Sequence, residues 1–194
     1  MISRLRGILL SRDFSTVEIE TSGGVVYEVD VPLTVDERLP ALGEAVELRT
    51  VQVTREDSVS LYGFLEIHER ELFKRLLTAS GVGARLALSM LSTFPARRLA
   101  QALAEKDLGA LTQVSGVGKK KAERLVLELS DKVQDLVVGS DGVPGPPLGA
   151  QGAVTALVAL GYSFSNADAA VRRALKEGGD LSTEELIRKA LSGK

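Results

Sequence analysis

The strongest constraint on the fold is a short motif that occurs twice in the middle of the chain. The sequence Ser-Gly-Val-Gly begins at Ser80 and again at Ser115, an offset of 35 residues (115 − 80). Apolar residues at helical spacing flank both copies, and many of them match at the same offset. Each copy therefore predicts a helix, a Gly-Val-Gly hairpin and a second helix. The matched apolar pairs are Leu76 with Leu111, Ala79 with Val114, Ala87 with Ala122, Met90 with Leu125, and Phe94 with Leu129.

The chemistry of such a hairpin favours phosphate. Glycine adopts positive φ and leaves no Cβ in the path of an approaching ligand. The helix after the hairpin begins with unpaired N–H groups and the positive end of its dipole. No side chain here reads a base edge, so we expect sequence-independent contacts to a DNA backbone. The predicted DNA-binding residues are Gly81, Val82, Gly83, Arg85, Gly116, Val117, Gly118, Lys119, Lys120, Arg124 and Arg55.

Other interpretations of the motif account for fewer of its residues. A Walker A loop needs Gly at position 113 and Ser or Thr at position 120, but the chain has Gln113 and Lys120. A plain helix–helix turn leaves unexplained the basic residues at the matching positions Arg85 and Lys120. The pattern resembles the helix-hairpin-helix motif of DNA-binding proteins, and no nucleotide or other cofactor site is predicted.

Charge and composition agree with this location. Residues 65–136 hold 12 basic and 9 acidic residues (+3), residues 1–64 hold 6 and 11 (−5), and residues 137–194 hold 6 of each. Polyanion binding is therefore expected in the middle segment. The chain has no cysteine and one histidine, His68, so no metal site is predicted. No apolar run approaches the ~20 residues that cross a bilayer, and we expect a cytoplasmic protein.

The first segment, residues 1–64, is predicted to be a small β-barrel. Residues 25–31 alternate with period two and put Val25, Tyr27, Val29 and Val31 on one face. Residues 16–20 alternate as well, and Ser22-Gly23-Gly24 between the two runs is typical of a hairpin turn. With strands at 8–10, 46–53 and 59–62, the pattern favours an OB-fold, although a two-sheet sandwich has the same pattern.

Helical periodicity follows, over residues 65–137. One apolar face extending from Ala122 to Leu136 predicts a single long helix, with charged residues such as Glu128 facing solvent or a ligand. Residues 138–150, rich in Gly and Pro, are predicted to be a linker. Residues 151–194 predict three short helices at 153–160, 165–176 and 182–191. Ser165 or Asn166 is the expected N-cap of the second, and Ser182 with Glu185 forms a capping box for the third.

Several segments together resemble the RuvA family. They are residues 1–7, residues 55–64, both hairpins and residues 156–162. The resemblance implies an α+β multidomain protein with an OB-fold, a tandem helix-hairpin-helix domain and a three-helix bundle similar to ubiquitin-associated domains. It implies a non-catalytic homotetramer that holds a four-way (Holliday) DNA junction open and flat, in recombination and repair. Implied partners are a RuvB-type hexameric ATPase and a RuvC-type resolvase; whether one or two tetramers bind the junction stays open.

The resemblance also assigns roles outside the hairpins. Glu56 and Asp57 would be an acidic pin that repels phosphates at the centre of the tetramer. A solvated turn and a metal-dependent nuclease site are the alternatives, and the second is disfavoured because neighbours on a strand point to opposite faces. Leu157, Leu160, Tyr162 and Leu191 would dock on the ATPase, or else form the bundle's own core. Enzymatic activity and a pure protein-interaction module are the competing functions.

Overall fold

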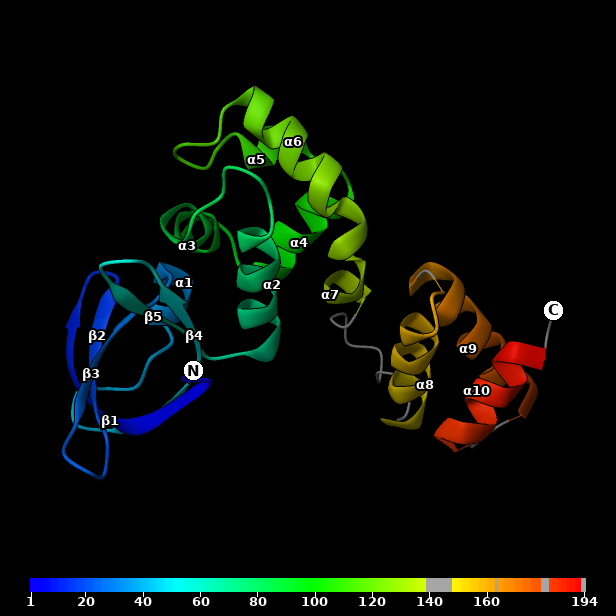
Figure 1. Ribbon diagram of the computed structural model, residues 1–194, viewed down its shortest axis with the longest axis horizontal. Coiled ribbons are helices and arrows are strands. Elements are labelled where there is room, and N and C mark those ends of the chain that lie inside the picture. The colour runs from blue at the N-terminus through cyan, green and yellow to red at the C-terminus, as the bar shows by residue number, and fades with distance from the viewer. Residues whose placement is uncertain (139–147, 163, 179–181, 193–194) are drawn as a thin grey trace. The chain divides into compact units, whose positions relative to one another are not determined.

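The computed structural model describes residues 1–138, 148–162, 164–178 and 182–192. The chain divides into two compact units, residues 1–137 and 138–194. The first unit contains a β-barrel and a helical domain, and the second contains three helices (Figure 1).

The barrel has five strands: β1 (Arg4–Asp13), β2 (Thr16–Glu20), β3 (Val26–Asp30), β4 (Ala45–Thr54) and β5 (Val59–Phe64). They close in the order β1-β2-β3-β5-β4, with β1 paired to β4. Every pairing is antiparallel except β3 with β5, which meet in parallel through the single pair Asp30 and Tyr62. The predicted OB-fold is confirmed, and closure excludes the two-sheet sandwich. A short helix, α1 (Leu33–Asp36), lies between β3 and β4 in the sequence.

The predicted hairpin of β2 and β3 is confirmed, with one correction. Val17, Ile19, Val29 and Val31 are all buried in the barrel, as alternation requires. Val25 was predicted on the same buried face, but it precedes β3 and is 52% exposed. Its carbonyl oxygen instead accepts hydrogen bonds from the backbone N–H and the hydroxyl of Thr21, so Val25 belongs to the turn.

The helical domain begins two residues after β5. Its elements are α2 (Ile67–Leu77), α3 (Ala84–Thr93), α4 (Ala96–Ala104), α5 (Leu108–Leu111), α6 (Lys119–Leu129), the 3₁₀ turn η1 (Ser130–Lys132) and α7 (Gln134–Val138). The residues matched by the repeat share one core, in which all are buried except the half-buried Phe94. The tandem arrangement is confirmed. In the second copy of the repeat, however, the helix before the hairpin is only the four-residue α5. Helix α4, which lies between the two copies, was not predicted as a separate helix.

The single long helix predicted between Ala122 and Leu136 is wrong. Helix α6 ends at Leu129 and a 3₁₀ turn separates it from α7. Ser130 and Asp131 are weak helix formers, which favours a break here. The Arg75 guanidinium of α2 binds the Lys132 carbonyl oxygen and the Asp135 carboxylate. A side chain from another helix therefore satisfies a carbonyl at the break, where the helix bonding pattern ends.

The second unit is the predicted bundle of three helices: α8 (Leu148–Ala159), α9 (Phe164–Gly178) and α10 (Thr183–Ser192). The capping box before α10 is confirmed, since the Ser182 N–H donates to the Glu185 carboxylate at 2.9 Å and the Glu185 N–H to the Ser182 hydroxyl at 3.4 Å. Ser165 and Asn166, the predicted N-caps of α9, both lie inside the helix, which begins at Phe164. Most of the predicted linker, residues 139–147, lies outside the described residues.

Candidate DNA-binding interface

The two hairpins have nearly the same backbone. Gly81 has φ of +77° and Gly116 has φ of +85°, a left-handed conformation that favours glycine. The Val82 N–H donates to the Ala79 carbonyl at 3.2 Å, and the Val117 N–H donates to the matching carbonyl in the second hairpin at 3.0 Å. Both valine side chains are buried in the domain core. The side chains of these valines, named among the predicted DNA-binding residues, therefore anchor the turns and leave the glycines at the surface.

Each hairpin leads directly into the start of a helix. Gly83 precedes α3 and Gly118 precedes α6, both with extended backbone and neither with a side-chain cap. The first N–H groups of these helices have no carbonyl partner within the helix. A Cβ added to Gly81, Gly83 or Gly118 would meet nothing within 4 Å. The donors therefore face open space into which a phosphate oxygen can approach.

The predicted cations gather beside these donors. Arg85 lies in the first turn of α3 and is exposed, and Lys119 and Lys120 are exposed in the first turn of α6. Arg124 lies one turn further along α6, where its guanidinium forms an ion pair with Glu128 at 2.8 Å. Lys121, which was not among the predicted residues, follows directly and adds a third lysine to this helix start.

Glu128 is the main residue that sequence reasoning missed. Its carboxylate accepts the N–H of Ser80 at 2.8 Å, so a side chain of α6 supports the backbone of the first hairpin. This backbone hydrogen bond, followed by the ion pair with Arg124, lowers the pKa of Glu128. The sequence shows only the spacing of Arg124 and Glu128 on one helix; nothing in it indicates a contact 48 residues away.

Arg55, Glu56 and Asp57 lie apart from the hairpins, on the barrel. They form the exposed turn between β4 and β5, which the Arg55 N–H closes by donating to the Ser58 carbonyl at 2.8 Å. The structure thus brings Arg55 together with the acidic pair and not with the other cations. Among the described residues no group of three or more His, Cys, Asp or Glu side chains is placed to hold a metal ion.

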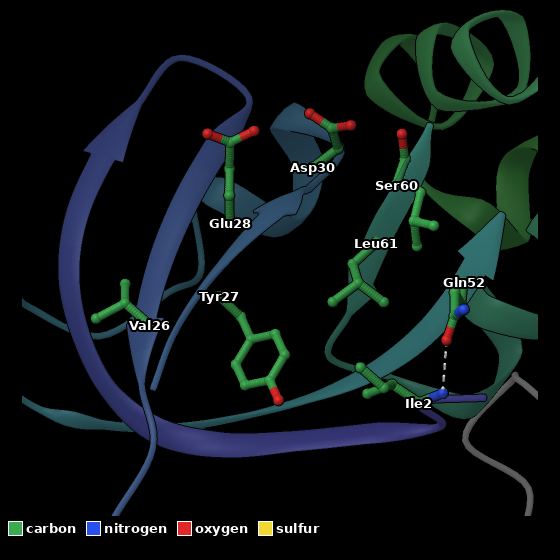
Figure 2. Close-up of a pocket in the computed structure, with 9 residues that line it drawn as sticks. Ile2, Val26, Tyr27, Glu28, Asp30, Gln52, Ser60 and Leu61 are labelled. Carbon is green, nitrogen blue, oxygen red and sulfur yellow. Dashed lines mark hydrogen bonds between the residues drawn. The ribbon is translucent and has the colours of Figure 1, made fainter. Parts of the chain in front are cut away.

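The barrel also has a pocket, of about 370 Å³, where β3 and β5 diverge (Figure 2). Glu28 and Asp30 of β3 are among its lining residues, as are Ser60 and Leu61 of β5. Two carboxylates in this opening repel phosphate, and the segment as a whole is acidic. The barrel pocket is therefore a poor candidate for a DNA site.

The proposed partner-binding residues of the C-terminal unit divide into two groups. Leu157 is 1% exposed and packs in the core of the bundle, so its prediction as a docking side chain is corrected. Leu157 lies on the face of α8 that α9 and α10 cover. Leu160 is 63% exposed and Leu191 is 40% exposed, while Tyr162 is half-buried against the core.

In the part of the chain that the structure describes, no helix is both long and apolar enough to cross a membrane.

Comparisons with known proteins cover all three parts of the chain. Residues 1–63 match the family RuvA N terminal domain, residues 73–131 match the SAM-like helix-hairpin-helix tandem, and residues 151–193 match the family RuvA, C-terminal domain. Three relatives are each named Holliday junction branch migration complex subunit RuvA. That of Gemmatimonas aurantiaca is 46% identical over 99% of this chain and 98% of its own length. Those of Pseudomonas putida (45%, covering 100% and 98%) and Salmonella schwarzengrund (43%, covering 98% and 98%) are similar over their full length as well.

Proposed function

The chain belongs to the RuvA family of Holliday junction branch migration complex subunits, and on that premise we propose that its two hairpins bind the arms of a four-way DNA junction. The observation that carries this proposal is the repeated hairpin geometry. Each hairpin has a glycine with left-handed backbone, followed by a helix start without a side-chain cap and with at least one cation beside it. The two hairpins therefore offer two phosphate-binding sites to one DNA backbone. The protein itself acts as a scaffold without a catalytic step, and junction DNA as its ligand favours the cytoplasmic location predicted above.

Phosphate contacts explain how such a protein tolerates any base sequence. Backbone N–H groups and lysine or arginine side chains neutralise phosphates without reading base edges. Affinity then depends mainly on salt and on the shape of the DNA. We propose that Arg85 and Lys119 to Lys121 supply this charge, with Arg124 further along the same helix face and Arg55 contributing from the barrel.

The acidic turn supplies the selectivity in this proposal. Glu56 and Asp57 are exposed in the turn between β4 and β5, and neither belongs to a hairpin. In a homotetramer, two carboxylates from each of four chains would meet at the junction's crossover. Their charges would repel a continuous duplex lying across the centre, since its phosphates would come within about 8 Å of them, the distance over which charges are only partly screened at physiological salt. The arms of a junction would pass around them.

The test compares four-way and linear DNA of equal length in a gel-shift titration. The parent protein should bind the junction more tightly. Glu56→Gln/Asp57→Asn should bind linear duplex more tightly than the parent does, while junction affinity persists. The ratio of the linear to the junction dissociation constant should therefore fall. A ratio that stays constant or grows would assign these residues to a solvated turn.

The C-terminal bundle is proposed to recruit a RuvB-type hexameric ATPase that moves the DNA. The exposed apolar side chains of Leu160 and Leu191 support this, with the half-buried Tyr162 between them in sequence. A RuvC-type resolvase is the further partner implied by the family. Leu160→Glu should abolish stimulation of the ATPase and leave junction binding unchanged, because the substituted side chain is already at the surface. Undiminished stimulation would move the docking surface elsewhere.

A further inference from the structure

The barrel and the hairpin domain are joined by an apolar contact that leaves little room for independent movement. Only two residues separate β5 from α2. The Phe73 ring of α2 lies 5.0 Å from the ring of Tyr62 and 5.0 Å from that of Phe64, both on β5. Val51 and Val53 of β4 pack against the same core. The turn that carries Glu56 and Asp57 connects β4 to β5. These same two strands also pack against the hairpin domain.

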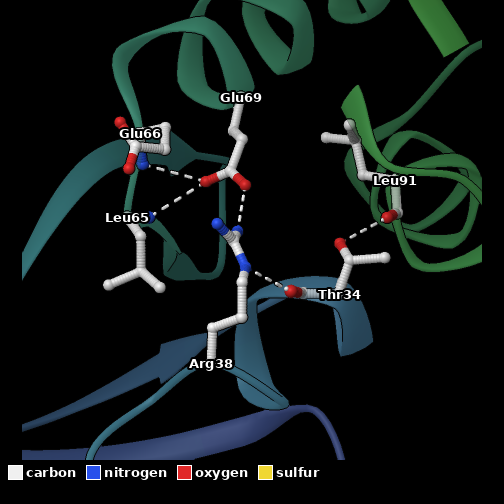
Figure 3. A network of polar contacts seen from close by, with 6 residues as sticks. All are labelled: Thr34, Arg38, Leu65, Glu66, Glu69 and Leu91. Atoms are coloured by element: carbon white, nitrogen blue, oxygen red, sulfur yellow. Dashed lines mark hydrogen bonds and ion pairs between the residues drawn. The ribbon is translucent and has the colours of Figure 1, made fainter. Parts of the chain in front are cut away.

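A polar network completes the joint on another side (Figure 3). Glu69 of α2 is only 6% exposed, and its carboxylate accepts the N–H groups of Leu65 at 3.1 Å and Glu66 at 2.9 Å. The same carboxylate forms an ion pair with Arg38, which follows α1 of the barrel. The Arg38 Nε also donates to the Thr34 carbonyl at 2.9 Å. One arginine therefore connects the barrel's helix to the start of the hairpin domain.

Helix α1 also holds α3, the helix that follows the first hairpin. The Thr34 hydroxyl donates to the Leu91 carbonyl at 2.8 Å, and the Leu33 N–H donates to the Ser92 hydroxyl at 3.0 Å. Leu91 and Ser92 lie in the last turn of α3, and the first hairpin lies at its other end. Because an α-helix is stiff over ten residues, fixing its last turn also fixes the direction in which the hairpin points.

We propose that Arg38 and Glu69 are positioning residues that hold the acidic turn at a fixed place relative to the two hairpins, and thereby set the discrimination between four-way and linear DNA. The inference rests on the proposed function. Repulsion between carboxylates and phosphates depends on distance, so a pin that moves relative to the hairpins loses selectivity. The hairpins themselves need no ion pair to bind a phosphate, so overall affinity for DNA survives.

The test uses the full chain with Arg38→Met, which keeps the length of the side chain and removes its charge. The expected result is a fall of about three- to tenfold in the ratio of linear to junction dissociation constants, with junction affinity itself little changed, where tenfold corresponds to about 1.4 kcal/mol. Arg4→Met is the matched control. Arg4 also pairs with a carboxylate, Glu47 at 3.0 Å, but this pair joins β1 to β4 and involves no residue of α1, so the ratio should not move.

A second measurement reports position without DNA. The chain has no cysteine, so Ser58→Cys and Ser115→Cys introduce the only two sites for spin labels, one in the acidic turn and one in the second hairpin. Labelled chains diluted with unlabelled ones give the distance within one chain. The distribution should be narrow in the parent, in Arg4→Met and in the charge-keeping Arg38→Lys, and should broaden or shift in Arg38→Met and Glu69→Gln.

The outcomes separate this inference from the proposed function. A parent protein without junction preference contradicts the proposed function, while the distance measurement still tests the joint. An unchanged ratio in Arg38→Met overturns the inference. A fallen ratio with an unchanged distance distribution also overturns it, because Arg38 would then act on DNA directly and not through position.

Discussion

The first and second hairpins have the same backbone and different electrostatics. Both have a left-handed glycine, a buried valine and a helix that starts without a side-chain cap. Where the second hairpin continues with three lysines, the first continues with the buried Ala84 and one cation, Arg85. The first also has a carboxylate, that of Glu128, bonded to the N–H of Ser80. The repeat thus preserves donor geometry while concentrating positive charge on one side.

This difference indicates a division of tasks between the hairpins. Geometry decides whether a phosphate oxygen fits against the N–H groups, and charge decides how strongly it is attracted. Loss of either glycine should therefore matter equally in the two hairpins. Loss of charge should matter more in the second.

The largest effect is expected from Gly81→Val and Gly116→Val. A β-branched residue at positive φ is held in a sparsely populated conformation, at a cost of about 1–3 kcal/mol. Each variant should lose junction affinity by about tenfold or more, and by similar amounts, because the two backbones match. Isothermal titration or gel shift measures the loss. A variant that binds like the parent would remove its hairpin from the interface.

Gly83→Ala and Gly118→Ala are the matched controls. Their φ values of −95° and −83° are ordinary for any residue, and a Cβ there meets no neighbour within 4 Å. Thermal melting should stay unchanged in both. Weaker binding in these variants would then report the close approach of DNA to the backbone, free of any effect on folding.

Charge removal should give the next largest effect on junction binding, and this effect should differ between the two hairpins. Lys119→Ala/Lys120→Ala is expected to reduce the slope of log affinity against log salt by about 1.8, at about 0.9 per phosphate contact, and Arg85→Ala by about 0.9. Neither variant should change the melting temperature, since the three side chains are exposed. Equal slopes for the two variants would contradict the electrostatic difference between the hairpins.

The smallest effect is expected at Glu128. Glu128→Gln keeps an oxygen that can accept the Ser80 N–H and removes a negative charge near the first hairpin, so junction affinity should rise by less than about tenfold. Glu128→Ala loses the hydrogen bond as well and should weaken binding by the first hairpin. A glutamine variant that binds more weakly than the alanine variant would exclude this account of the carboxylate.

The pH dependence of stability tests the same residue. Because the Ser80 N–H and then Arg124 lower the pKa of Glu128, its stabilising contribution is complete above the ordinary value of 4.5 and declines as pH falls below that value. The difference in melting temperature between the parent and Glu128→Gln should therefore be constant at neutral pH and should shrink as the pH falls below about 4.5. A difference that is independent of pH would mean that the carboxylate makes no special contribution.

Local patterns predicted most of the fold and the hairpins. Period-two alternation identified β2 and β3, and the 35-residue repeat identified both hairpins and the residues buried around them. These features depend on neighbours in the sequence. The break after Leu129 was missed because the apolar face continues through it, and the carbonyl that it frees is satisfied by Arg75, 57 residues away.

The features that could not be predicted from the sequence depend on contacts between distant segments. The bond from the Ser80 N–H to Glu128 and the ion pair between Arg38 and Glu69 depend on charged side chains whose sequence surroundings are ordinary for a solvated surface. Exposure within a helix is similarly ambiguous. Leu157 and Leu160 are three residues apart on apolar positions, yet the first is core and the second is at the surface, because α8 ends at Ala159 and only Leu157 lies on the face that α9 and α10 cover.

The claim that the two hairpins contact only the DNA backbone is tested most directly by measuring junction affinity against salt concentration, for two four-way junctions with unrelated arm sequences. If phosphates alone are contacted, the two junctions should give steep parallel lines of log affinity against log salt that differ by less than about tenfold at every salt concentration. A difference of more than about tenfold between the two junctions at fixed salt, or a flat salt dependence for both, would contradict it.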